Sequence, residues 1–167
     1  MATQTALVGI GSNLSWHGMP PDELATVAVR VLNRFGAAAM SPLYDSPSWP
    51  DASKPAYVNA VATLQTELPA GFLLAVCQGI EAAFGRQRDP HDRNAPRTLD
   101  LDLLAMGDLV LKTETLTLPH PRLAERDFVL APLADIAPNW RHPLSGVGAA
   151  ALLKRLPDRT VRRRSCA

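Results

Sequence analysis

The apolar run at residues 99–106 is interrupted by two carboxylates, Asp100 and Asp102. A run of this kind is typical of a strand buried in the middle of a sheet. Side chains at positions i and i+2 of a strand point to the same face, so the two aspartates lie side by side. Aspartate is a poor strand former and neighbouring carboxylates repel each other, so a nearby cation has to compensate. The sequence therefore predicts a central strand that carries a cation site. The alternative is a strand whose solvated face simply carries acids.

Two kinds of cation are candidates for this site. One is a divalent metal ion, Mg²⁺ above all, because carboxylates are its usual protein ligands. The other is a group of arginines just upstream, which are Arg86, Arg88, Arg93 and Arg97. Each arginine alone has another explanation, either surface solubility or pairing with Asp89 or Asp92. Together, an acid pair and an arginine cluster are typical of phosphoryl transfer.

Composition favours a single folded domain at residues 1–160, followed by a flexible basic tail at 161–167. The chain has 167 residues, of which 47% are hydrophobic, and this is enough for a core. Its net charge of +1 argues against a nucleic-acid partner. No apolar run reaches membrane-spanning length and the first residues do not resemble a leader. We therefore expect a cytoplasmic protein without membrane contact.

The periodic segments predict the order β-α-β-β-α-β, an α+β sandwich of the ferredoxin-like kind with helices on one face of the sheet. Apolar spacing and turn residues indicate strands at 6–11, 37–45 and 57–68, and helices at 20–35 and 69–84. The fourth strand carries the two aspartates and ends at Gly107. Beyond it we expect C-terminal additions, namely a hairpin within 109–118 and a helix at 127–137.

Several familiar phosphate-binding motifs are incomplete. Gly9 and Gly11 begin a dinucleotide fingerprint, but Leu14 stands where its third glycine belongs, so we interpret them as a tight strand end. None of the lysines follows a glycine, which excludes a Walker-type loop. The histidines lack the spacing of a zinc site.

The segment Arg93–Leu104 resembles the signature of the 6-hydroxymethyl-7,8-dihydropterin pyrophosphokinase family. Further stretches resemble the family in the same order, and these are residues 11–14, 44–47, 57–60, 81, 85–86, 116–120 and 126–133. The family transfers pyrophosphate from ATP to the hydroxymethyl group of a reduced pterin, releases AMP, and acts in folate biosynthesis. The resemblance thus implies an ATP-dependent pyrophosphokinase with a ferredoxin-like fold.

Carried over by position, the resemblance also implies the roles of individual residues. The implied catalytic residues are Arg86, Arg97, Asp100 and Asp102, with two Mg²⁺ ions held by the aspartates. The implied ATP-binding residues are Gln78, Glu81, Arg88, Arg93, Thr117, His120 and Arg126. The implied pterin-binding residues are Ser46, Pro47, Trp49, Tyr57, Asn59 and Phe128, with Tyr57 and Phe128 sandwiching the ring.

Two other function classes stay open at this point. One is a non-catalytic ferredoxin-like domain that binds a nucleotide for regulation. The other is an interaction module whose arginine loop contacts RNA, which the near-neutral charge disfavours. For the enzyme, we expect a monomer whose loops at 46–56 and 86–96 close over ATP and the pterin.

Overall fold

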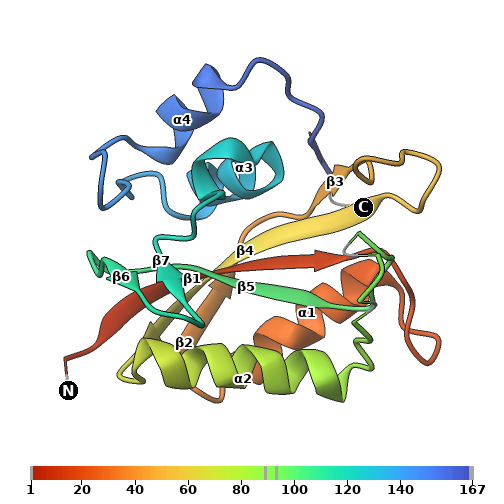
Figure 1. Ribbon diagram of the computed structural model, residues 1–167, viewed down its shortest axis with the longest axis horizontal. Coiled ribbons are helices and arrows are strands. Elements are labelled where there is room, and N and C mark those ends of the chain that lie inside the picture. Colours follow the sequence, from red (N-terminus) through yellow and green to blue (C-terminus); the bar gives the residue numbers. More distant parts are fainter. Residues whose placement is uncertain (1, 89, 93, 166–167) are drawn as a thin grey trace.

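The computed structural model describes residues 2–88, 90–92 and 94–165. Figure 1 shows a twisted sheet between two layers of helices. The elements in chain order are β1 (Gln4–Ser12), α1 (Pro21–Leu32), β2 (Ala37–Met40), β3 (Tyr44–Ser46), β4 (Tyr57–Thr66), α2 (Ala70–Ala83), β5 (Asp100–Met106), β6 (Leu111–Lys112), β7 (Thr117–Leu118), the 3₁₀ turn η1 (Leu123–Glu125), α3 (Asp127–Ile136), α4 (Ala149–Arg155) and β8 (Arg162–Arg163).

The main sheet has the order β5-β1-β4-β3-β8, with β2 also paired to β4, and its strand pairs are antiparallel. The expected β-α-β-β-α-β order and the α+β class are confirmed. The strand expected at 37–45 is divided, because β2 pairs with the far half of β4 and β3 with its near half. Pro42 lies at the break, where it has no N–H to donate to a ladder.

The expected central position of the aspartate-bearing strand is wrong, because β5 lies at the edge of the sheet and pairs with β1. It is nevertheless buried, since α2 covers one face and α3 lies over the other (Figure 1). The N–H of His120 also donates to the carbonyl of Leu104 at 2.7 Å, which occupies part of the open edge. An apolar run therefore indicated burial correctly, but not the number of neighbouring strands.

Helices cover both faces of the sheet rather than the one face that we expected. Helices α1 and α2 pack on one face, where Val8, Leu73 and Leu101 belong to the larger core cluster. Helices α3 and α4 pack on the other face, where Leu104 of β5 and Leu130 of α3 belong to the second core cluster. The second layer comes from the C-terminal additions, which include the expected hairpin (β6 and β7) and helix (α3).

The C-terminal segment differs from the solvated tail that its arginines predict. Strand β8 pairs with β3 in the register Tyr44↔Arg163 and Asp45↔Arg162. The N–H of Arg164 then donates to the carbonyl of Leu43 at 2.8 Å. The side chains of Arg162 and Arg163 are exposed, as their charge predicted. Their backbone groups, in contrast, pair with the sheet. Among the described residues, no helix has the length and apolar character that a bilayer crossing requires.

Candidate active site

Asp100 and Asp102 project from β5 toward the α3 side of the sheet. The register pairs them with Gly11 and Gly9 of β1. Both glycines line a cavity above the strand, and a Cβ at Gly11 would lie 3.7 Å from Asn59 Oδ1 and 3.8 Å from Asp100 Cβ. The two glycines are therefore the floor of a cavity within a regular strand, and not the tight strand end that we expected.

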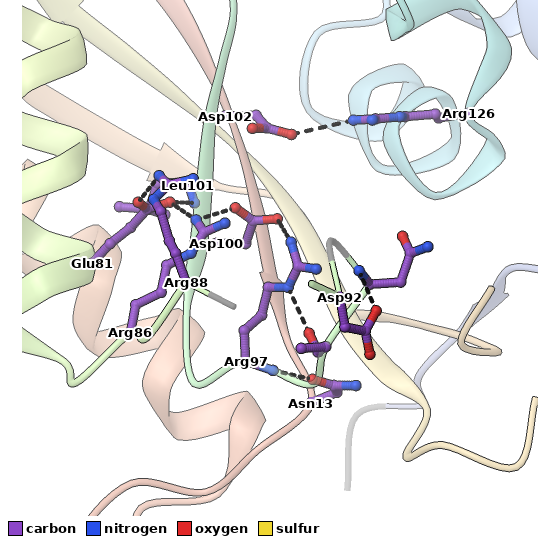
Figure 2. Close-up of polar contacts among 12 residues, drawn as sticks. Asn13, Glu81, Arg86, Arg88, Asp92, Arg97, Asp100, Leu101, Asp102 and Arg126 are labelled. Carbon is purple, nitrogen blue, oxygen red and sulfur yellow. Dashed lines mark hydrogen bonds and ion pairs between the residues drawn. The ribbon is translucent and has the colours of Figure 1, made fainter. Parts of the chain in front are cut away.

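The carboxylate of Asp100 lies among arginines (Figure 2). Arg86 Nη1 donates to Asp100 Oδ1 and also to Glu81 Oε1. On the other side, Arg97 Nη1 lies 3.0 Å from Asp100 Oδ2. Two arginines of the predicted cluster thus neutralise Asp100 directly, and Asp92 pairs instead with Lys54 at 2.7 Å.

Glu81 connects α2 to the aspartate-bearing strand. Its side chain is 4% exposed, and its Oε1 accepts the Leu101 N–H at 2.7 Å. Its other oxygen pairs with Arg88 at 3.2 Å. Burial raises the pKa of Glu81, while the Leu101 N–H and the charge of Arg86 act in the opposite direction. This carboxylate therefore holds two arginines and the strand in a fixed relation.

Asp102 has a different set of neighbours. Arg126 Nη1, at the start of α3, lies 3.2 Å from Asp102 Oδ2. Burial raises the pKa of Asp102, and the charge of Asp100 adds to this rise. Burial also lowers the pKa of nearby His120, whose Nδ1 accepts the Arg122 N–H at 3.1 Å. Because an accepting Nδ1 carries no proton, the geometry indicates a neutral imidazole.

A cavity of about 530 Å³ lies on the α3 side of the aspartates, between the loop after β3 and the start of α3. Aromatic groups of Tyr57 and Phe128 line it, together with the amide of Asn59. The Asn59 Nδ2 donates to Ser46 Oγ at 2.8 Å, and this buried bond fixes the orientation of the amide. The cavity thus combines apolar surfaces with one oriented polar group, as small-molecule sites usually do.

A second cavity, of about 320 Å³, lies on the other side of the aspartates. Its walls are α2, the loop that follows it, and the β6–β7 hairpin. Besides the two aspartates, charged and polar side chains line it, which are Gln78, Glu81, Arg86, Arg88, Thr113, Glu114, Thr115, Thr117 and His120. Asp100 and Asp102 line both cavities, so the carboxylate pair stands where the two spaces meet.

Comparison with known proteins shows the family to which the chain belongs. Residues 7–138 match the family model of 7,8-dihydro-6-hydroxymethylpterin-pyrophosphokinase (HPPK). The chain belongs to this family. It is 42% identical over 143 residues to the 2-amino-4-hydroxy-6-hydroxymethyldihydropteridine pyrophosphokinase of Pseudomonas aeruginosa, covering 84% of this chain and 85% of that one. It is 37% identical over 156 residues to the enzyme of the same name from Haemophilus influenzae, covering 92% and 94%.

Solved structures support the HPPK fold. The Plasmodium falciparum HPPK-DHPS structure with pteroate superposes with a TM-score of 0.69 at 13% identity, covering 91% of this chain. Another HPPK-DHPS structure, in complex with substrates, gives a TM-score of 0.71 at 10% identity, covering 98% of this chain. The chain spans 42% and 47% of those longer proteins, so at these identities they show the fold alone. The curated relatives are named as pyrophosphokinases, which does not support the regulatory, non-catalytic alternative.

The residues that the HPPK resemblance singled out lie around the two cavities. The first cavity is lined by Arg97, Arg126 and all of the predicted pterin-binding residues, namely Ser46, Pro47, Trp49, Tyr57, Asn59 and Phe128. The second is lined by Arg86 and most of the predicted ATP-binding residues, namely Gln78, Glu81, Arg88, Thr117 and His120. Arg126, predicted to bind ATP, lines the first cavity because it immediately precedes α3. Arg93 lies outside the described residues.

Asn13 is a site residue to which the sequence reasoning gave no role. Its Oδ1 accepts the Arg97 N–H at 2.8 Å, and its own N–H donates to the Arg97 carbonyl at 3.1 Å. Its Nδ2 donates to the Pro55 carbonyl at 3.0 Å. The residue that follows β1 therefore holds the 46–56 loop at Pro55 and the end of the 86–96 loop at Arg97. The signal was present, since Asn13 lies in the Gly11–Leu14 stretch that resembles the family.

Proposed function

We propose that this HPPK-family chain transfers a pyrophosphoryl group from ATP to the hydroxymethyl group of 6-hydroxymethyl-7,8-dihydropterin and releases AMP. The observation that carries the assignment is the meeting of the two cavities at Asp100 and Asp102. One cavity suits a flat heterocycle and the other a polyphosphate. A group transferred between their occupants has to pass the carboxylate pair.

The cavity on the α3 side binds the pterin in this proposal. Tyr57 and Phe128 offer aromatic faces for a planar ring. The amide of Asn59, held by Ser46, offers hydrogen bonds to the polar edge of the ring. Trp49 has 73% of its surface exposed beside this cavity, so it is available to cover a bound pterin.

The polar cavity binds ATP in this proposal. Guanidinium groups bind phosphate oxygens bidentately, and Arg86 and Arg88 are placed there. The neutral ring of His120 and the hydroxyl of Thr117 add uncharged hydrogen-bonding groups. Glu81 keeps the arginines in position and is not itself suited to contact a triphosphate, because both of its oxygens are already paired.

The donor set at Asp100 and Asp102 fits the two expected Mg²⁺ ions. Mg²⁺ is commonly held by one or two carboxylates, with water and substrate phosphates completing its shell. The two side chains are 24% and 39% exposed, so their oxygens are accessible. Among the described residues, no cluster of three or more acidic, histidine or cysteine side chains is arranged for a metal, so the substrate phosphates have to supply further ligands. When bound, the ions supply charge neutralisation and alignment.

The arginines act by exchanging partners. Arg86, Arg97 and Arg126 now pair with the aspartates. If Asp100 and Asp102 held Mg²⁺, the charge of the metal would replace that of the arginines, and the guanidinium groups would be available to bind phosphate oxygens. A primary alcohol is a weak nucleophile and the cavity residues provide no strong base beside it, so catalysis relies on alignment and electrostatic stabilisation.

A direct assay tests the proposal. The purified protein is mixed with ATP, Mg²⁺ and 6-hydroxymethyl-7,8-dihydropterin, and nucleotides are separated by chromatography. We expect AMP rather than ADP, and no turnover when EDTA removes the metal. A folded protein that forms no AMP would contradict the proposal. The cytoplasmic location and the monomeric state stay predictions, and sedimentation analysis tests the second.

A further inference from the structure

The C-terminal residues 160–164, which we call the strap, run along one wall of the pterin-side cavity. Thr160 lines this cavity together with Asp127 and Phe128. The family match ends at residue 138, so the strap lies beyond it. Figure 1 shows this segment descending from α4, past the start of α3, toward β3.

One end of the strap is held by Asp127, the first residue of α3. Its Oδ2 accepts the Thr160 N–H at 2.6 Å, the Val161 N–H at 3.0 Å and the Thr160 hydroxyl at 3.2 Å. The residue is 8% exposed. Asp127 is the acidic residue in the first turn of α3, where the helix dipole favours a negative charge. The hydrogen bonds of its Oδ2 go to the strap.

The other end of the strap is held by β3. Arg163 and Arg162 pair with Tyr44 and Asp45. Arg164 Nε also lies 2.7 Å from Asp45 Oδ1. Strand β3 ends at Ser46, whose hydroxyl orients Asn59. The strap therefore joins the α3 wall of the cavity to the β3 wall.

We propose that Asp127 is a positioning residue for the pterin, which acts by fastening the strap and so fixing the distance between Phe128 and the Ser46–Asn59 pair. The inference rests on the proposed function of the cavity. Phe128 follows Asp127 directly in the first turn of α3, so a change in the Asp127 anchor moves the aromatic wall. The nucleotide cavity has no strap residue in its lining. The effect is accordingly specific for the pterin.

The test measures pterin and ATP affinity separately in the full-length protein. Asp127→Ala removes the acceptor, and we expect the KM for the pterin and the Kd of 6-hydroxymethylpterin in calorimetry to rise about ten-fold. The KM for ATP should stay within about two-fold. Asp127→Asn keeps an oxygen where Oδ2 lies and should restore most of the affinity, because the donors of the strap need only that one atom.

A donor-side variant checks that the strap transmits the effect. Thr160→Pro removes the Thr160 N–H and its hydroxyl, and it should raise the pterin Kd as Asp127→Ala does. The pterin Kd of the double variant should be no higher than that of either single variant, because both substitutions break the same hydrogen-bonded contact. Asp158→Asn is the matched control, since it changes an exposed acidic side chain just before the strap that does not line the cavity. It should leave the pterin Kd unchanged.

Two results would overturn the inference. One is an unchanged pterin Kd in Asp127→Ala, and the other is an equal loss of pterin and ATP affinity in that variant. Thermal unfolding identifies any variant that fails to fold. If Asp127→Ala does not fold, the pterin and ATP affinities of Asp127→Asn are compared with those of wild type instead. Failure of the proposed function itself is recognised separately, because the wild-type protein would then bind no pterin.

Discussion

Asp100 and Asp102 lie two positions apart on one strand, yet they are paired with cations from different parts of the chain. Asp100 lies between Arg86, which follows α2, and Arg97, which precedes β5. Asp102 pairs with Arg126 at the start of α3. The two carboxylates therefore hold three arginines from different parts of the chain around the point where the two cavities meet.

Replacing either aspartate should abolish turnover while the fold persists. Asp100→Asn and Asp102→Asn each remove a negative charge that would hold Mg²⁺ against the reacting phosphates, so kcat should fall by at least about 10²-fold. AMP release measures the loss, and thermal unfolding reports the fold. The control is Asp108→Asn, in the exposed turn after β5, which should keep near-wild-type activity. Wild-type rates in both site variants would remove the catalytic role of the pair.

Replacing Glu81 should lower the free energy of unfolding, because Glu81 has a structural role in the site. Its buried carboxylate pairs with Arg86 and accepts the Leu101 N–H, so Glu81→Ala leaves that buried N–H without an acceptor and leaves the buried Arg86 with Asp100 alone. Breaking a buried pair in this way typically lowers the free energy of unfolding by about 3–5 kcal/mol. Urea denaturation measures the change. Glu67→Ala, at an exposed position, is the control and should stay within about 0.5 kcal/mol of wild type. A Glu81 variant as stable as this control would contradict the prediction.

The sequence predicted the chemistry of the site better than its surroundings. Asp100 and Asp102 stood out because two charges in an apolar strand need compensation, and that argument is local. The same apolar run did not show that β5 is an edge strand, because burial by helices and burial by strands leave the same pattern. Gly9 and Gly11 were misinterpreted for a similar reason. Their role as a cavity floor depends on Asp100 and Asn59, which come from distant parts of the chain.

The sequence did not predict that the strap pairs with β3, because the polarity of side chains does not indicate how their backbone groups pair. Arg162 and Arg163 are charged and exposed, as a solvated tail would be. Their backbone groups nevertheless join β3, and nothing in the residue types indicates that edge as a partner. Arg126 shows a related limit, since its residue type predicted an anion contact while its place beside α3 decided which cavity it lines.

The pterin site should depend on the orientation of one amide. Asn59→Ala removes the buried group that Ser46 Oγ holds at 2.8 Å, so the KM for the pterin should rise by about 10- to 100-fold. The KM for ATP should be unaffected, because Asn59 lines the pterin-side cavity. Steady-state kinetics with each substrate varied in turn measures both constants. Asn33→Ala, in the turn after α1 and remote from the cavity linings, is the control. Equal KM values for the pterin in wild type and Asn59→Ala would show that the amide does not bind it.

His120 should make the protein less stable in mild acid. Burial lowers its pKa below the ordinary value of about 6.5, with the charges of Arg126 and Arg122 acting in the same direction and Asp102 opposing them. The unfolded chain therefore binds the proton more tightly than the folded protein does. The contribution of the neutral ring to stability is fully present above about pH 6.5 and is lost as the pH falls toward the folded pKa. Protonation would also remove the Nδ1 acceptor that the Arg122 N–H uses.

Replacing His120 by a residue that does not titrate separates this contribution from those of the carboxylates. His120→Asn keeps a hydrogen-bond acceptor for the Arg122 N–H but does not titrate. The free energy of unfolding of this variant should therefore change less than that of wild type between pH 7.5 and pH 5. The difference between the two slopes should approach, and not exceed, about 1.4 kcal/mol per pH unit, because one proton is involved. Urea denaturation at several pH values provides the measurement. Parallel pH profiles for the two proteins would mean that His120 is not held neutral by burial.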